Sequence, residues 1–295
     1  MEVSVPFIKG RARSNKGLYI VNIGLFLKKS VFVYRLFKKN VYLCTILYMR
    51  EFMADSIQLP VSIEKCPIID ALIELRFETK VNPSAVFGMI YSVLMEKYPG
   101  EVINLPILQL PEAVRNSDPA LKYKPLYRIV SKEVLIQIGP DVISISSVIP
   151  YIGWNRFKGH VVEIVNLVSN SKIINRVSRL GHRYINFFES NILDQITMSF
   201  KMTEGYSPQN IQVTTQVKDC DFDNTIQFSN SAMLNVNLPS QKNGSIIDID
   251  TFREYNDNCF LENIVSEIEN AHIIEKTLFF SLLKPDFIKS LNPHY

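Results

Sequence analysis

Hydrophobic and polar residues alternate most clearly between residues 68 and 78. The apolar residues at odd-numbered positions are Ile69, Ala71, Ile73, Leu75 and Phe77. The residues between them, most of which are charged, are Asp70, Leu72, Glu74, Arg76 and Glu78. Successive side chains of a strand point to opposite faces, so this pattern predicts a half-buried strand. Its polar face carries two glutamates with an arginine between them.

Three segments instead space their apolar residues at the helical period. Asn82 and Pro83 provide a cap and a first turn for a helix that ends before Tyr98-Pro99-Gly100. A second helix is predicted over residues 154–169. The third is the longest, from about Cys259 to Leu283, and the Lys284-Pro285 pair ends it.

The remaining segments are mostly extended. Residues 101–125 contain four prolines and little periodicity, which predicts a long loop. Strands are predicted at 126–130, 134–138, 142–148, 173–188, 195–202, 210–218, 225–229, 232–238 and 245–251, with a kink in the 173–188 strand at Gly181.

This order of elements predicts an α+β fold. A mostly antiparallel sheet carries two internal helices and a long C-terminal helix packed on it. Residues 53–295 are expected to form a single domain, with two subdomains, 53–170 and 171–295, as the alternative. A strand–helix–strands order recurs weakly along the chain, although the residues themselves do not repeat.

Charge separates residues 1–52 from the rest of the chain. The first 52 residues contain ten Lys or Arg and two Glu, whereas residues 53–295 contain 22 Lys or Arg and 27 Asp or Glu. Lys28 and Lys29 interrupt the apolar stretch, and no small-x-small cleavage site follows. We interpret residues 1–52 as a non-native or disordered basic extension, with translation starting at Met53. A targeting or partner-binding arm is the alternative.

The net negative charge of residues 53–295 also limits which classes of partner they can bind. A net acidic segment without a basic stripe of interleaved aromatics makes nucleic acid an improbable partner, and no membrane partner is expected. Four scattered cysteines without a Cys-x-x-Cys argue against a disulfide framework or a zinc site and favour the cytoplasm. No Gly-rich phosphate loop, nucleophile elbow or His-Glu-x-x-His occurs, so no cofactor is predicted.

Charged residues at two-residue spacing mark a candidate ligand-binding surface. Its strand members are Glu74, Arg76, Glu78, Arg179, Arg183, Asp248 and Asp250. If the strands are neighbours, these groups meet on one face, and Gly181 leaves room for close approach. Three interpretations remain: a solvated ion-pair ladder, a pocket whose arginines grip a small anionic ligand, or a divalent-metal site at Asp248, Asp250 and Glu78. We assign no catalytic residue and no metal ligand.

His272 completes the candidate set. It lies on the margin of the apolar stripe of the C-terminal helix, beside Ile268 and Phe279, with Glu269 and Glu275 one turn away on either side. A general base needs such a neighbour to orient it. A structural histidine is the alternative for a lone imidazole in this position.

Five segments together carry a family resemblance. They are residues 66–78 (CPIIDALIELRFE), 134–145 (VLIQIGPDVISI), 179–186 (RLGHRYIN), 246–250 (IIDID) and the end helix with Ala271-His272 followed by Phe279-Phe280. In this order they resemble a sporadically distributed prokaryotic family of uncharacterised proteins, over about residues 60–295. The resemblance implies a cytoplasmic prokaryotic protein and supplies no mechanism.

Two functions follow as hypotheses. The first is a non-catalytic cytoplasmic binding or interaction module with an unknown protein partner or a small anionic ligand, in an operon of a mobile-element or defence type. The operon context follows from the sporadic distribution alone. The alternative is a hydrolase, divalent-metal-dependent in one version, that uses carboxylates and arginines on the central strands. The missing catalytic motifs favour the binding module, and the oligomeric state stays open.

The first testable prediction concerns residues 1–52. A chain of residues 53–295 should fold and melt within about 5 °C of the full chain, because periodicity begins only after Met53. Thermal unfolding of both chains followed by circular dichroism measures the difference. A larger loss of melting temperature would show that the basic segment belongs to the fold.

Overall fold

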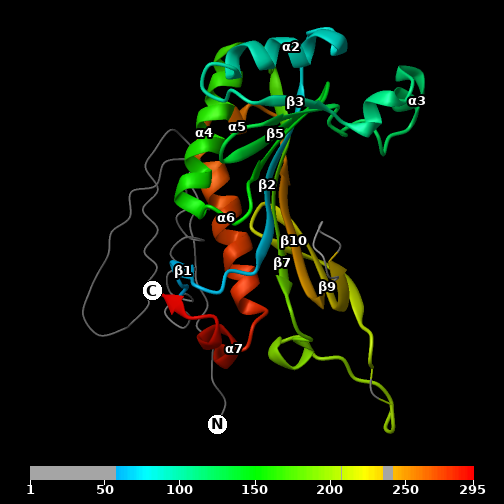
Figure 1. Cartoon of the computed structure of the whole chain (residues 1–295), viewed down its shortest axis with the longest axis vertical. Coiled ribbons are helices and arrows are strands. Elements are labelled where there is room, and N and C mark those ends of the chain that lie inside the picture. The colour runs from blue at the N-terminus through cyan, green and yellow to red at the C-terminus, as the bar shows by residue number, and fades with distance from the viewer. Residues whose placement is uncertain (1–57, 207, 235–241) are drawn as a thin grey trace, which may run out of the picture. The chain divides into compact units, whose positions relative to one another are not determined.

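The computed structural model describes residues 58–206, 208–234 and 242–295 (Figure 1). The interpretation of residues 1–52 therefore lies outside the described residues, as does the end of the strand expected at 232–238. Residues from Leu59 to Tyr295 form one unit.

One nine-stranded antiparallel sheet organises this unit, in the order β3-β4-β5-β6-β2-β7-β10-β9-β8. Its strands are β2 (Ile68–Glu78), β3 (Glu101–Asn104), β4 (Tyr127–Val130), β5 (Val134–Ile138), β6 (Val142–Ser147), β7 (Arg176–Phe188), β8 (Gln212–Asp219), β9 (Phe222–Leu234) and β10 (Lys242–Glu254). A separate two-stranded ladder joins β1 (Ser62–Ile63) to β11 (Pro293–His294).

The described helices are α2 (Pro83–Leu94), α3 (Glu112–Ser117), α4 (Trp154–Asn170), α5 (Cys259–Glu262), α6 (Ile264–Ser281) and α7 (Pro285–Ser290), with short 3₁₀ turns η1 (Pro106–Gln109) and η2 (Leu193–Gln195). The longest of them cover one face of the sheet, whereas α3 projects away from it (Figure 1). The long helices α4 and α6 lie side by side against the sheet (Figure 1). The predicted α+β fold with a C-terminal helix on an antiparallel sheet is confirmed. Among the described residues, no helix has the length and apolar character needed to cross a membrane.

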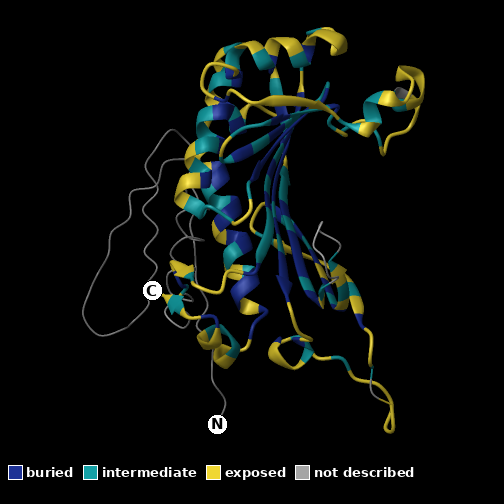
Figure 2. Cartoon of the chain, viewed as in Figure 1, coloured by how far each residue is buried: buried dark blue, intermediate teal, exposed yellow. Residues whose placement is uncertain are grey.

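Local sequence explains where these elements begin. The apolar positions of β2 from Ala71 to Phe77 are at most 2% exposed and face the helices, as the alternation predicts. The Asn82 side chain accepts a hydrogen bond from the Ser84 backbone N–H at 3.0 Å and caps α2. Buried faces of the sheet, α4 and α6 are dark in Figure 2, and their outer faces are exposed.

Two predicted strands differ in the structure. Residues 195–202 form no strand: Ile192 and Ile196, on either side of the turn η2, are buried in the smaller apolar cluster, and Ile196 makes an isolated bridge with Leu283. The strand expected at 225–229 and the described residues 232–234 of the strand expected at 232–238 belong to one continuous strand, β9. The Asn230 side chain accepts a hydrogen bond from the Ile211 N–H and donates one to the Gln209 carbonyl, so it ties β9 to the residues that precede β8.

Helix predictions also need correction. The C-terminal helix breaks at Asn263, whose amide donates to the Cys259 carbonyl at 3.0 Å, so α5 and α6 replace one helix. Pro285 ends α6 as expected but then starts α7, which the sequence reasoning missed. Similarly, the predicted loop 101–125 contains the edge strand β3 and the helix α3.

The order of elements repeats between the two halves of the unit. The first half runs β2, α2, the meander β3 to β6, then α4; the second runs β7, η2, the meander β8 to β10, then α6. In each half the first strand pairs with the last strand of its meander, and β2 pairs with β7 at the centre. The recurrence that is weak in the sequence is therefore clear in the topology.

Two apolar clusters lie under the helices. The larger includes Ile268, Ala271 and Ile274 of α6, and the smaller includes Phe279 and Phe280 farther along the same helix. Buried polar residues of α6 and β7 lie where one cluster gives way to the other.

Candidate functional site

The charged residues predicted from strand spacing come together on the open face, defined as the sheet face away from α4 and α6. Strands β2, β7 and β10 are neighbours, with Arg76 opposite Arg179 and Asp250 opposite Arg183. The alternate residues of the same strands, such as Ile73 and Ile249, point to the other face and are buried under the helices. The prediction that these charges share one side of neighbouring strands is confirmed.

On this face the arginines and carboxylates pair with each other. Arg183 donates from Nε and Nη2 to the two oxygens of Asp248 at 2.8 and 2.6 Å. Arg179 donates to Asp250 at 2.9 Å and to Glu74 at 3.2 Å, and Arg76 donates to Glu74 at 2.8 Å. Such mutual pairing is the geometry of a cross-strand ion-pair ladder.

Partial burial shapes the electrostatics of this ladder. The hydrogen bonds that Arg183 donates to Asp248 raise the pKa of the Arg183 guanidinium. Burial raises the pKa of Asp250 even though Arg179 opposes the effect. Glu78 pairs with Arg176 instead, beyond the irregularity between Arg76 and Phe77 in the β2–β7 register, and this bond lowers the pKa of Glu78.

Gly181 provides the space for Arg179. A Cβ at Gly181 would lie 2.6 Å from Nη1 of Arg179 and 3.5 Å from an oxygen of Asp250. The register of β7 runs through Gly181 without a shift on either side. The predicted kink is therefore wrong, and the predicted close approach is explained by the guanidinium of the chain itself.

His272 lies on the opposite side of the sheet and does not join the charged surface. It is 7% exposed and stacks on Trp154 with ring centroids 3.8 Å apart. Tyr184 approaches its Nδ1 at 3.4 Å and bonds the Tyr151 hydroxyl at 2.7 Å. His182 of β7 packs edge-on against the Trp154 and Tyr184 rings. We call these five rings, Tyr151, Trp154, His182, Tyr184 and His272, the aromatic cluster.

Glu275 of α6 is the unexpected member of this region. It is 0% exposed, as is His182 of β7, and Oε2 of Glu275 lies 3.9 Å from Nδ1 of His182. Within the described part of the chain, neither side chain makes a hydrogen bond. Buried polar groups are normally bonded, and an unbonded one costs about 1–3 kcal/mol. This pair therefore needs a functional explanation.

Burial keeps these groups uncharged. It raises the pKa of Glu275 well above 4.5, and the negative charge of Asp248 adds to the effect. It also lowers the pKa of His182 to about 3 and, with smaller contributions from neighbouring positive charges, that of His272 to about 2. At neutral pH both imidazoles are therefore neutral, and burial favours the protonated form of the Glu275 carboxyl beside them.

A cavity of about 320 Å³ adjoins Glu275. Its wall consists of residues 60–63 and 66–68, residues 151–154 at the start of α4, two residues of β7 and the inward side of α6. Polar groups in this wall include His272, Glu275, Lys276 and Asn186, whereas Phe279 and Phe280 supply an apolar side. Concave, mainly apolar pockets with a few polar groups are typical of small-molecule sites.

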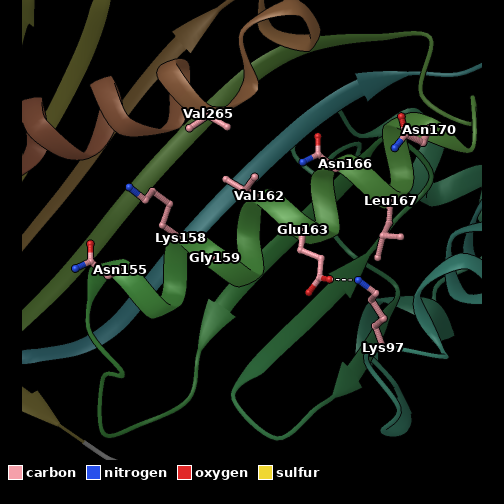
Figure 3. Close-up of a pocket in the computed structure, with 10 residues that line it drawn as sticks. All are labelled: Lys97, Asn155, Lys158, Gly159, Val162, Glu163, Asn166, Leu167, Asn170 and Val265. Carbon is pink, nitrogen blue, oxygen red and sulfur yellow. Dashed lines mark hydrogen bonds and ion pairs between the residues drawn. The ribbon is translucent and has the colours of Figure 1, made fainter.

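A second depression along the outer side of α4 has a different character (Figure 3). Its lining includes Asn155, Lys158 and Asn166, and Glu163 pairs there with Lys97 across to the end of α2. Asn155 and Asn166 are exposed, so water can satisfy them. No buried, unbonded group points to a ligand at this groove.

Sequence reasoning did not assign His182 to the site and named Glu275 only as a neighbour of His272, although signals for both exist. His182 has the opposite strand parity to the two arginines, which places it on the helix side. Glu275 follows Ala271 by four positions and precedes Phe279 by four, so it interrupts the apolar face of α6. A charged residue inside an apolar stripe is the pattern that predicts a buried acid.

No protein-family model matches this chain, and the search of curated proteins finds no similar sequence. The resemblance to a sporadically distributed prokaryotic family stays a prediction. The candidate site is therefore argued from the geometry of the described residues.

The ladder generates one prediction. Gly181→Val should place side-chain atoms where the Arg179 guanidinium lies and break its bonds to Glu74 and Asp250, at a cost of about 1–3 kcal/mol in unfolding free energy. Arg179→Met removes the same bonds. Urea unfolding of both single variants and the double variant tests the shared cause, because the costs should then fall well short of additive. Additive costs would contradict it.

Glu275 generates a prediction about pH. The folded state keeps Glu275 protonated, whereas the unfolded chain ionises it above about pH 4.3. As pH rises from 4 to 8, the unfolding free energy of the parent chain should fall relative to Glu275→Gln, by at most about 1.4 kcal/mol per pH unit. Urea unfolding across this range measures the difference.

The control for this series is Glu262→Gln, an exposed glutamate that precedes α6. It reports any general effect of removing one negative charge from this end of the molecule. A constant difference between the parent chain and Glu275→Gln at all pH values would contradict burial of a protonated carboxyl.

Proposed function

We propose that this chain is a non-catalytic binding module that holds a small organic molecule in the cavity beside Glu275. One observation carries the proposal: Glu275 is fully buried, lines the cavity and has no hydrogen-bond partner among the described residues. A ligand polar group would satisfy it, and the aromatic wall would cover an apolar body. The molecule is held by groups that the fold already positions.

The chemistry of the wall favours binding over catalysis. Both histidines are held neutral, and no described serine, threonine or cysteine hydroxyl or thiol is hydrogen-bonded to His182 or His272. A nucleophile needs such a base within hydrogen-bond reach. The aromatic cluster instead provides stacking surfaces and a short hydrogen-bond chain.

A hydrolase on the open face ranks second. That function needs carboxylates available to a cation or a water, whereas Asp248, Asp250 and Glu74 each accept from an arginine. Among the described residues, no group of three or more His, Cys, Asp and Glu is arranged to hold a metal ion. A small anionic ligand at Arg179 and Arg183 would first have to displace these carboxylates. The operon context stays a prediction.

Native mass spectrometry of the purified full chain tests the binding module. We expect a small molecule to be retained, and we expect Cys66→Phe to weaken its retention because the larger side chain narrows the opening of the cavity, where Cys66 is exposed. Ser266→Phe, on the exposed side of α6, should retain it. In parallel, aromatic amines, alcohols and acids are titrated against Trp154, the single tryptophan of the sequence. Tryptophan fluorescence should change saturably.

Absence of both a retained mass and a fluorescence change would remove the proposed function. Equal binding by the parent chain and Cys66→Phe, with unchanged melting temperatures, would place the ligand elsewhere. The melting temperature of each variant is measured alongside binding, so that loss of fold is not mistaken for loss of the site.

A further inference from the structure

The charge of the ligand can be inferred from what surrounds Glu275. No described cation stabilises its carboxylate: the influences on its pKa are burial and the negative charge of Asp248. Lys276, the next residue, also lines the cavity, but the neighbouring charge that acts on its ammonium is that of Glu269. The buried acid therefore lacks a counter-charge.

Aromatic rings surround the same space. Tyr151, Trp154 and Tyr184 line the cavity, and Phe279 and Phe280 close its apolar side. Ring faces attract cations, most strongly when water is excluded. Trp154 already attracts one cation, since Nζ of Lys158 lies 5.8 Å from its ring centroid. A carboxyl enclosed by aromatic rings is the arrangement that recognises an ammonium group.

We propose that the cavity binds an organic cation, a protonated amine on a small apolar or aromatic body, with Glu275 as its counter-ion. This inference rests on the proposed function and adds the class of ligand. The ammonium would lie against the carboxylate, and the body would lie among the rings toward Phe279 and Phe280. Charge-assisted bonds in a water-poor site are about twice as strong as neutral ones.

Proton release follows from this arrangement. Burial favours the protonated form of Glu275 before binding, whereas a bound ammonium favours the carboxylate, so a proton is released to solvent as the amine enters. Other titratable groups face Glu275. They are His182 and Tyr184 of β7, Tyr151 and Cys66 of the cavity wall, and His272 and Lys276 of α6, whereas Asp248 acts only through its charge from the open face of the sheet. The imidazoles are neutral, and burial raises the pKa of Tyr151 and Tyr184, so these four groups stay uncharged from pH 6 to 8.

The test uses three probes of matched shape: phenethylamine, 2-phenylethanol and phenylacetate. Trp154 fluorescence of the full chain gives each dissociation constant. We expect the amine to bind at least about tenfold more tightly than the alcohol, and phenylacetate to bind most weakly. Amine affinity should rise between pH 6 and 8, because the released proton favours the complex at higher pH. Alcohol affinity should not change.

Glu275→Gln separates the carboxylate from the shape of the cavity. It should reduce amine affinity by at least about tenfold, remove the pH dependence and leave alcohol affinity within about twofold. If this variant does not fold, the pH series on the parent chain still decides the question. If the alcohol or the acid binds as tightly as the amine or more tightly, the proposal of a cationic ligand is overturned. The proposal of a binding module would still stand. Failure of all three probes together with no retained mass would overturn the binding module itself.

Discussion

The pairing of β2 with β7 is the constraint on which the other elements depend. One meander extends from β2 through β6, and the other extends from β7 through β10. Strand side chains alternate, so this one register decides which residues face the helices and which face outward. A slip of β2 by one residue against β7 would turn Glu74 toward the helices and expose Leu75. The fold therefore has little freedom at its centre.

Charged side chains on one side of the central β2–β7 strands are paired, whereas Glu275 on the other side has no hydrogen-bond partner among the described residues. On the open face each arginine of the ladder, Arg76, Arg179 and Arg183, has a carboxylate partner within 3.2 Å. On the helix side Glu275 is buried without a partner, and burial suppresses its ionisation. Uncompensated burial lowers stability, and proteins retain such groups mainly at functional sites. This contrast moves the candidate site from the charged ladder to the cavity.

Residue spacing predicted the parts of the structure that depend on local pattern. The bounds of β2 and the cap of α2 follow from alternation and from Asn82, and the ladder follows from two-residue spacing on three strands. The cavity does not follow, because His182 and Glu275 come from strands and helices that only tertiary packing brings together. The strand prediction for residues 195–202 failed for a related reason, because isolated isoleucines that fill a core resemble a strand in the sequence.

The small ladder between β1 and β11 has a consequence for synthesis. Residues 60–63 form part of the cavity wall, and Ser62 and Ile63 are held by His294 and Pro293. Lys65 bonds the Ser290 carbonyl across a separation of 225 residues. A nascent chain thus carries an unfinished wall until residues 290–294 have been synthesised. Because a ligand stabilises only a chain that can bind it, this molecule would gain that stabilisation only after these residues have paired.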